Sequence, residues 1–207
     1  MADLGRAALF VSLGLALYAT LVGAWAAHAR KRRLSDSAGN ALLAALGSTA
    51  VAGAVLLSAL VRHDFSFVYV AQHTSTELPT GYSISAFWGG QEGSLLLWLL
   101  VLTAYAAAAV LINRRRAPDL VAWSVPVLGV VSTFFAFMLV AVSSPFATQV
   151  APADGAGLNP SLQNPYMMIH PPMLYLGYVG LTIPFAFAMG ALLARRTDEL
   201  WIVATRR

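Results

Sequence analysis

Residues 95–112 read LLLWLLVLTAYAAAAVLI, without a charged side chain, and residues 114–116 are three arginines. An apolar stretch of about this length can cross the hydrocarbon core of a bilayer as one α-helix. Lys and Arg gather at the cytoplasmic ends of such helices. The stretch therefore predicts a transmembrane helix that ends at a basic anchor.

Four further apolar runs have the same character, near 7–27, 41–61, 120–142 and 172–193. The whole chain of 207 residues is 58% hydrophobic and 11% charged, against about 25% charged in a soluble domain. We therefore expect an all-α, polytopic membrane helix bundle of about five transmembrane helices, forming a single membrane domain over residues 1–207. A cleaved signal peptide is the alternative for run 7–27, but its basic cluster follows the apolar run instead of preceding it.

The basic clusters fall on one side of the membrane when the five predicted spans are followed along the chain. One side collects the clusters at 30–33, 114–116, 195–196 and 206–207, whereas the other holds only Arg6 and Arg62. The positive-inside rule then predicts an outside N-terminus and a cytoplasmic C-terminus. Because the positive charge lies in short clusters between apolar runs and forms no stripe, no nucleic-acid partner is expected.

Two outside segments follow from this topology, 62–94 and 143–171, and we expect function there. The chain has no Cys, which excludes a redox CxxC motif and a CxxCH haem attachment site on this chain. A transporter is disfavoured because the spans hold almost no ionisable residue, whereas ion paths place such groups inside the membrane.

The first outside segment closes with WGGQEGS at 88–94. Trp88 offers a stacking face, while Gly89, Gly90 and Gly93 permit close backbone approach and positive φ. Glu92 stands where a helix N-terminus favours an anion. A flat ligand could lie on this turn. The alternative is a plain turn and helix cap, with Trp88 in the aromatic belt at the membrane surface.

The second outside segment is stiffened by prolines and contains His170-Pro171-Pro172. Pro172 is predicted in the first turn of the fifth helix, which leaves His170 just outside the helix. Its imidazole could bind a haem iron or another metal, or it could simply bond a backbone carbonyl. The methionines at 167, 168 and 173 could supply a thioether ligand or fill gaps. His63 and His73 match no metal motif, so both are expected at the surface.

Three motifs resemble the CcmF family: WGGQEGSLLLW at 88–98, NPSLQNP at 159–165 and HPPMLYLGYVG at 170–180. CcmF is a membrane component of cytochrome c maturation that acts in joining haem to apocytochrome c. The resemblance covers the N-terminal part of the family. The tryptophan-rich haem segment, the second periplasmic histidine and the membrane histidine pair of that family are absent, so we expect a fragment or one piece of a split protein.

The resemblance implies that His170 is an axial ligand to b-type haem in transit to cytochrome c. Trp88, Gly89, Gly90 and Glu92 are hypothesised to form a nearby wall. The implied partners are the haem chaperone CcmE, a CcmH-type apocytochrome-binding component, apocytochrome c and the remainder of CcmF, at the lipid bilayer of the bacterial inner membrane. Catalysis by this part alone is not expected. The alternative function is a non-catalytic membrane scaffold or docking module.

Overall fold

The computed structural model describes residues 1–196 and 198–205. Within these residues the chain forms helices and no β-strand, apart from one isolated antiparallel bridge between Phe67 and Thr148. The predicted all-α class is confirmed. Arg206 and Arg207, which belong to the last predicted basic cluster, lie outside the described residues, as does Thr197.

Five described helical segments are long and apolar enough to cross a membrane. They are α1 (Ala2–His28), α2 (Arg32–Val61), α5 (Gln91–Asn113), α6 (Pro118–Ala141) and α7 (Pro165–Gly180), which α8 (Thr182–Leu193) continues. The expected number of spans is confirmed, and the chain is a multi-pass membrane protein. The helices extend beyond the apolar runs; α2 begins at Arg32 instead of residue 41, and its first turns pack through the buried Ala38 and Gly39 against neighbouring helices.

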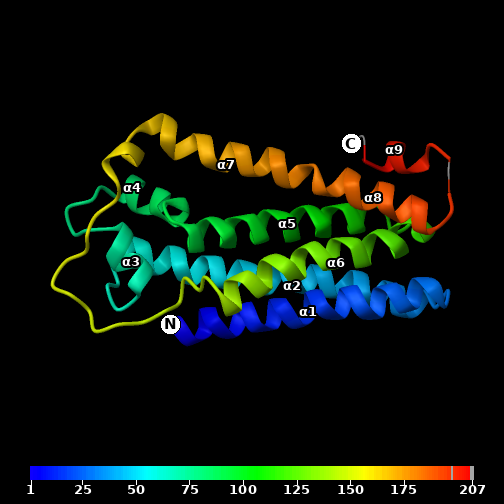
Figure 1. The fold of residues 1–207 in the computed structure, drawn as a ribbon, viewed down its shortest axis with the longest axis horizontal. Helices are drawn as coiled ribbons and strands as arrows, with labels where there is room; N and C mark the ends of the chain where they lie inside the picture. The colour runs from blue at the N-terminus through cyan, green and yellow to red at the C-terminus, as the bar shows by residue number, and fades with distance from the viewer. Residues whose placement is uncertain (197, 206–207) are drawn as a thin grey trace.

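Short helices occupy the connections between the long ones. α3 (Val68–His73), α4 (Thr80–Ser85) and the 3₁₀ turn η1 (Ala86–Trp88) lie between α2 and α5. A second 3₁₀ turn, η2 (Pro160–Leu162), precedes α7, and α9 (Leu200–Thr205) follows α8. Figure 1 shows α3, α4 and the long 143–164 connection together at one end of the elongated bundle.

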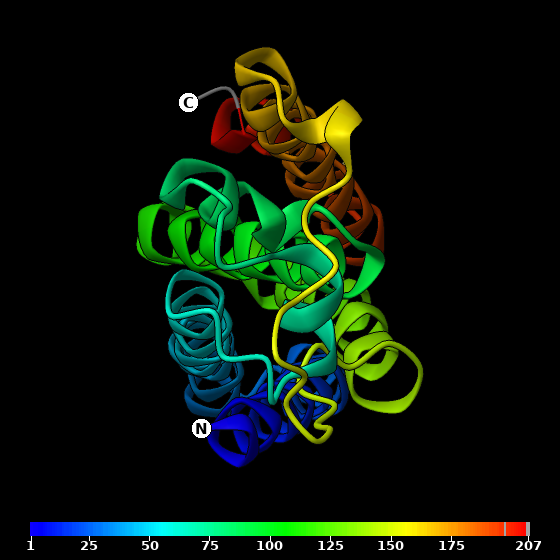
Figure 2. The same cartoon turned by 90° about the vertical axis from the view of Figure 1, so that its left-hand side faces the viewer.

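The long helices pack side by side around two apolar cores. α1 packs against α2 and α6, α5 contacts α2 and α6, and α8 packs on α6. The end view in Figure 2 shows α7 and α8 on the opposite side of the bundle from α1 and α2. The larger core lies toward the end with α3 and includes Phe67, Phe146 and Leu96.

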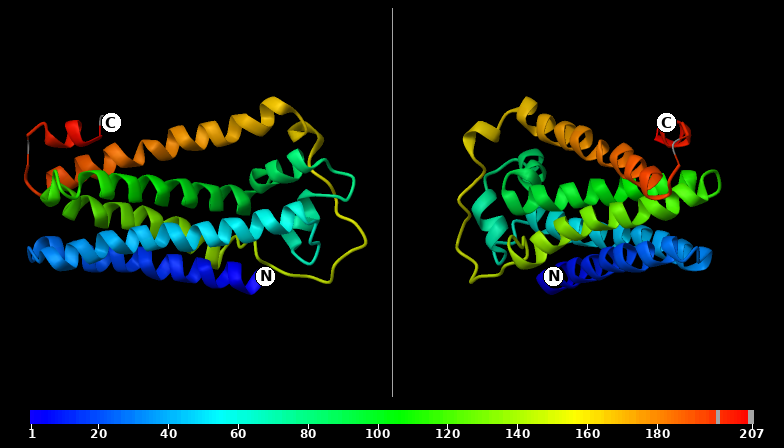
Figure 3. Two further views of the ribbon diagram at one scale, coloured as in Figure 1. Left: turned by 180° about the vertical axis from the view of Figure 1, so that it is seen from behind. Right: turned by 45° about the vertical axis from the view of Figure 1, so that its right-hand side comes forward.

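The two ends of the bundle differ in chemistry, as the alternation of charge predicted. Arg30, Arg32, Arg114 and Arg196 line one pocket at the end opposite α3 and α4, and both predicted outside segments lie at the other end (Figures 1 and 3). The bundle therefore separates a basic end from an end made of connections. That the basic end faces the cytoplasm stays a prediction.

The fifth span begins earlier than predicted. α7 starts at Pro165, not near Pro172, so the helix includes residues 165–171 of the segment predicted to lie outside. Asn164 caps the helix: its side-chain oxygen accepts from the Tyr166 N–H at 2.9 Å, and its carbonyl accepts from the Met168 N–H at 3.0 Å. The cap and first-turn proline of Asn164-Pro165 fit the preferred pattern for a helix start.

The adjacent prolines that suggested a helix start lie inside α7 instead. Proline has no N–H, so Pro171 and Pro172 leave the carbonyls of Met167 and Met168 without their usual helical partners. Neighbouring helices, side chains or water can compensate for such a gap in membrane helices. The prediction was wrong because it treated the proline pair as the boundary and passed over the stronger signal seven residues upstream.

Small residues let the long helices approach closely. A Cβ added to Gly129 of α6 would lie 2.6 Å from Thr20 Oγ1 and 2.8 Å from the Thr20 backbone nitrogen of α1. At Gly190 of α8 an added Cβ would lie 2.5 Å from Ser124 Oγ of α6. Close packing of small residues is the usual source of helix association in membranes.

Gly129→Ala should therefore loosen the α1–α6 contact and lower stability by about 1–3 kcal/mol, the usual cost of overpacking. Thermal unfolding in detergent measures this change. Gly14→Ala is the matched control, since an added Cβ there meets nothing within 4 Å. Equal unfolding temperatures for the two variants would contradict the packing argument.

Candidate functional site

Backbone hydrogen bonds join the two connecting segments at the non-basic end. The Val68 N–H donates to the Ala147 carbonyl at 2.9 Å, and the Ala156 N–H donates to the Ala71 carbonyl at 2.7 Å. Asp154 accepts from the backbone N–H of Thr76 at 2.9 Å, and this bond and another backbone N–H hold the pKa of its carboxyl below the usual value. The segments therefore form one cap over the helices.

Tyr69 of α3 is the buried centre of this cap. Its hydroxyl lies 2.8 Å from the Ala86 carbonyl and 3.1 Å from the Phe87 carbonyl, as a donor, and it accepts from the Gly90 N–H at 3.0 Å. Burial raises the pKa of the Tyr69 phenol well above its usual value, so the group stays neutral and able to donate. One side chain thus fixes the backbone from Ala86 to Gly90.

The glycines of the WGGQEGS turn are explained by the same side chain and its neighbour. A Cβ on Gly93 would overlap the Phe87 carbonyl and the Tyr69 hydroxyl, and a Cβ on Gly90 would overlap His73 Nε2. Of the two freedoms that glycine permits, positive φ is not used: Gly89 has φ −70° and Gly90 has φ −131°, and Gly93 is also outside the positive region. Close approach requires these glycines, and the side chains that approach them belong to this chain.

Trp88 and Glu92 flank this turn. Trp88 ends η1, is half-buried and packs against the core beneath the cap. Glu92 lies in the first turn of α5 and is half-buried, where the helix dipole favours a carboxylate. Both residues are thus held in place by local structure, with part of each side chain accessible.

His170 lies on an exposed surface of α7, within the helix and not before it, which corrects the predicted position. Residues three and four positions away share its face of the helix. These are Tyr166, Met167, Met173 and Leu174, and all four are exposed, Tyr166 to 83% and Met173 to 61%. The imidazole is therefore surrounded by apolar, accessible side chains.

A hydrogen-bonded path connects the helix of His170 to the Trp88 turn. The Tyr175 hydroxyl of α7 donates to Ser94 Oγ of α5 at 3.2 Å, and the Ser94 hydroxyl donates to the Trp88 carbonyl at 3.0 Å. The Tyr175 ring also contacts Trp98, with ring centroids 5.4 Å apart. The structure thus places α7 next to the predicted turn, through residues that sequence reasoning had not singled out.

His63 and His73 were predicted to lie at the surface, but both are half-buried. His63 Nε2 lies 3.2 Å from Ser83 Oγ. His73 stacks on Tyr69, with ring centroids 4.2 Å apart, and its Nδ1–H donates to the Tyr69 carbonyl at 2.8 Å. Their contacts are internal to the cap, which explains both residues as structural.

The donor set restricts what the site can bind. Within the described residues, no group of three or more His, Cys, Asp and Glu side chains could hold a metal ion. A haem iron needs only one side-chain ligand on each face, and the haem ring is flat and largely apolar. An exposed imidazole on an apolar helix face meets that requirement for one face of the haem, whereas a zinc or calcium cage needs more ligands.

The fold and the site together define a multi-pass helical membrane protein in which, among the described residues, His170 is the one exposed histidine at the end that carries the cap. A sequence model described as "Cytochrome C assembly protein" matches residues 88–205. The chain belongs to this family. The match contains the Trp88 turn, both proline motifs and α7.

Individual relatives agree with this assignment. The chain is 38% identical to the cytochrome c-type biogenesis protein CcmF of Escherichia coli (strain K12), over 100% of this chain and 32% of the relative. It is 41% identical to CcmF of Pseudomonas aeruginosa, over 96% of this chain and 31% of that protein. A solved structure of the cytochrome c haem lyase CcmF superimposes with a TM-score of 0.84 at 31% identity and covers 99% of this chain.

The chain spans about a third of the length of the curated relatives that it matches. The resemblance to CcmF inferred from the sequence motifs is thus confirmed. The relation extends beyond the motifs, since α1 and α2, which lie before the family match, are covered by the relatives and by the solved structure.

Tyr69→Phe should remove the hydroxyl that the Ala86, Phe87 and Gly90 backbone groups share. Unpairing buried polar groups costs about 1–3 kcal/mol, so the variant should unfold at lower temperature. Tyr82→Phe is the matched control, because within the described residues the Tyr82 hydroxyl makes no hydrogen bond. Unchanged stability of Tyr69→Phe would contradict the central role of this residue.

Proposed function

We propose that this chain is the N-terminal part of a haem lyase component of cytochrome c maturation and that His170 binds the haem iron. The observation that carries the proposal is the exposed imidazole of His170 at the centre of an apolar face of α7. Membership of the cytochrome c assembly family and the likeness to the haem lyase CcmF support it.

Haem is the substrate in this proposal, and each part of the chain has a defined task. A neutral His170 gives a ring-nitrogen lone pair to the iron. The apolar side chains of Tyr166, Met167, Met173 and Leu174 contact the ring and exclude water from one of its faces. Trp88, Gly89, Gly90 and Glu92, joined to α7 through Ser94 and Tyr175, form a second wall nearby.

The reaction served by this placement is thioether formation. Each thiol of an apocytochrome CxxCH motif adds its sulfur to one carbon of a haem vinyl group and its hydrogen to the other, so the step has no net oxidation or reduction. The thiols belong to the apocytochrome, because this chain has no Cys. The chain's own task is to hold and orient the haem while the vinyl groups react.

The proposed partners follow from the system to which the relatives belong. The chaperone CcmE delivers b-type haem, a CcmH-type component presents apocytochrome c, and the remainder of CcmF supplies the second axial ligand. A second ligand is required because the described part of this chain offers one exposed histidine at the non-basic end. This division assigns haem capture to both parts of the protein and catalysis to neither part alone.

Replacing His170 with Ala should abolish haem transfer in the complete maturation system, because the iron loses one axial ligand. The yield of covalent cytochrome c and the Soret band of the purified membrane protein measure the effect. His28→Ala is the matched control, since His28 is exposed at the opposite end of the bundle. Normal yield from His170→Ala would overturn the assignment and favour a scaffold that docks partner proteins.

We further propose that the chain lies in the bacterial inner membrane with the cap outside and the arginine-rich end in the cytoplasm. The absence of Cys allows a clean test. A Cys at Val150, which is 94% exposed in the cap, should react with a membrane-impermeant maleimide in intact cells. A Cys at the exposed Arg115 should react only after the membrane is broken. The reverse pattern would contradict the orientation.

A further inference from the structure

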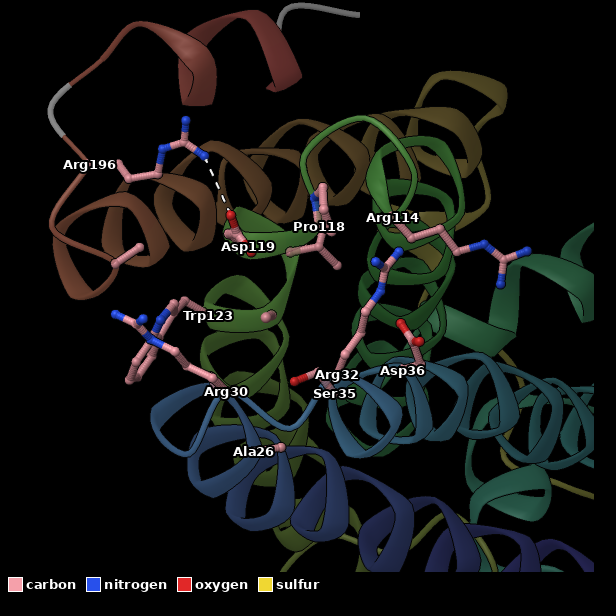
Figure 4. A pocket seen from close by; sticks show the side chains of 14 residues that line it. Ala26, Arg30, Arg32, Ser35, Asp36, Arg114, Pro118, Asp119, Trp123 and Arg196 are labelled. Atoms are coloured by element: carbon pink, nitrogen blue, oxygen red, sulfur yellow. Dashed lines mark ion pairs between the residues drawn. The ribbon is translucent and has the colours of Figure 1, made fainter.

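A pocket of about 440 Å³ lies at the arginine-rich end of the bundle, at the opposite end from His170 (Figure 4). It is lined by the last turn of α1, the starts of α2 and α6, the residue after α5 and the residues after α8. Its charged lining residues are Arg30, Arg32, Asp36, Arg114, Asp119 and Arg196. Cations therefore outnumber carboxylates around it.

The carboxylates do not neutralise this pocket. Asp119 lies 3.9 Å from Arg196, and Arg196 also pairs with Asp198 at 3.0 Å. In the described part of the chain, Arg30, Arg32 and Arg114 have no carboxylate oxygen within 4.0 Å. Because the Arg114 side chain is directed away (Figure 4), Arg30 and Arg32 are the two of these that remain available to an external anion.

The helix starts at the pocket add to this positive charge. α2 and α6 both begin at the pocket, and neither start has a side-chain cap, so their free N–H groups carry partial positive charge. Arg30 adopts φ 54°, the left-handed region that glycine enters more easily. The turn thus holds Arg30 next to the pocket in a backbone conformation that is unfavourable for a residue with a Cβ.

The pocket also has an apolar side. The half-exposed Ala122 and Trp123 of α6 line it, together with the buried Ala26 of α1 and Val121 of α6. Figure 4 shows the Arg32 side chain extending from α2 toward Pro118 at the start of α6, while Arg114 is directed away. A ligand that satisfies this lining must carry an anion at the membrane surface and hydrocarbon below it.

We propose that this pocket binds the phosphate of an anionic phospholipid headgroup. Arginine matches phosphate oxygens through paired N–H donors, and basic pockets between membrane helices on the cytoplasmic side are suited to such headgroups. A soluble phosphate compound shares the anion but not the acyl chains, so it would leave the apolar side uncovered. The bound lipid would brace the basic ends of α1, α2 and α6.

Lipid retention measured by native mass spectrometry tests the proposal. The protein is purified in neutral detergent and given phosphatidylglycerol, phosphatidylcholine or inorganic phosphate. Retention of one phosphatidylglycerol in preference to phosphatidylcholine is expected. The double variant Arg30→Gln/Arg32→Gln should bind phosphatidylglycerol about ten-fold or more weakly, because each basic residue near a membrane surface contributes several-fold in affinity.

Arg33→Gln/Arg115→Gln is the matched control, since it removes the same charge from neighbouring positions that do not line the pocket. Equal loss of lipid in the two double variants would overturn the proposal in favour of a diffuse basic belt. Displacement of phosphatidylglycerol by an equal concentration of inorganic phosphate would overturn the proposal that the ligand is a lipid, in favour of a soluble phosphate compound. Circular dichroism and a single elution peak establish that each variant is folded.

Discussion

The requirement that backbone polar groups be paired inside lipid governs this structure. α1, α2 and α5 meet it with helices that contain no internal proline. α6 departs from it at Pro126 and α7 at Pro171 and Pro172, since each proline leaves a carbonyl without its helical N–H donor. Such a gap is least costly where water or a neighbouring group can pair the carbonyl. The proline pair of α7 lies directly beside the exposed His170, at the end of the bundle that carries the cap (Figure 1).

The cap depends on close packing in place of regular secondary structure. Tyr69 forms hydrogen bonds with three backbone groups around the Trp88 turn. The Tyr69 and His73 side chains leave no room for a Cβ at Gly90 and Gly93. The turn is therefore held by contacts within this chain. Hydrogen bonds through Ser94 and Tyr175 connect the turn to α7.

Much of the fold could be predicted from the sequence, because a membrane span is defined by length and polarity within one segment. The runs at 7–27, 41–61, 95–112 and 120–142 therefore match helices. The start of the fifth helix was missed because Asn164-Pro165 and His170-Pro171-Pro172 give competing local signals, and only the capping bond of Asn164 decides between them. The roles of Tyr69 and Tyr175 could not be predicted, because they depend on contacts between distant segments; the glycines at 90 and 93 were the single hint.

Chemical rescue tests most directly whether His170 binds haem iron. The variant His170→Gly would be placed in the complete membrane protein, purified after expression with the haem chaperone, and its Soret spectrum recorded with and without added imidazole. Our account predicts that the Soret absorbance of the variant falls below that of the unchanged protein, because the haem bound through His170 is lost, and that imidazole restores it by replacing the missing ligand. Equal Soret absorbance in the variant and the unchanged protein without imidazole would contradict the account.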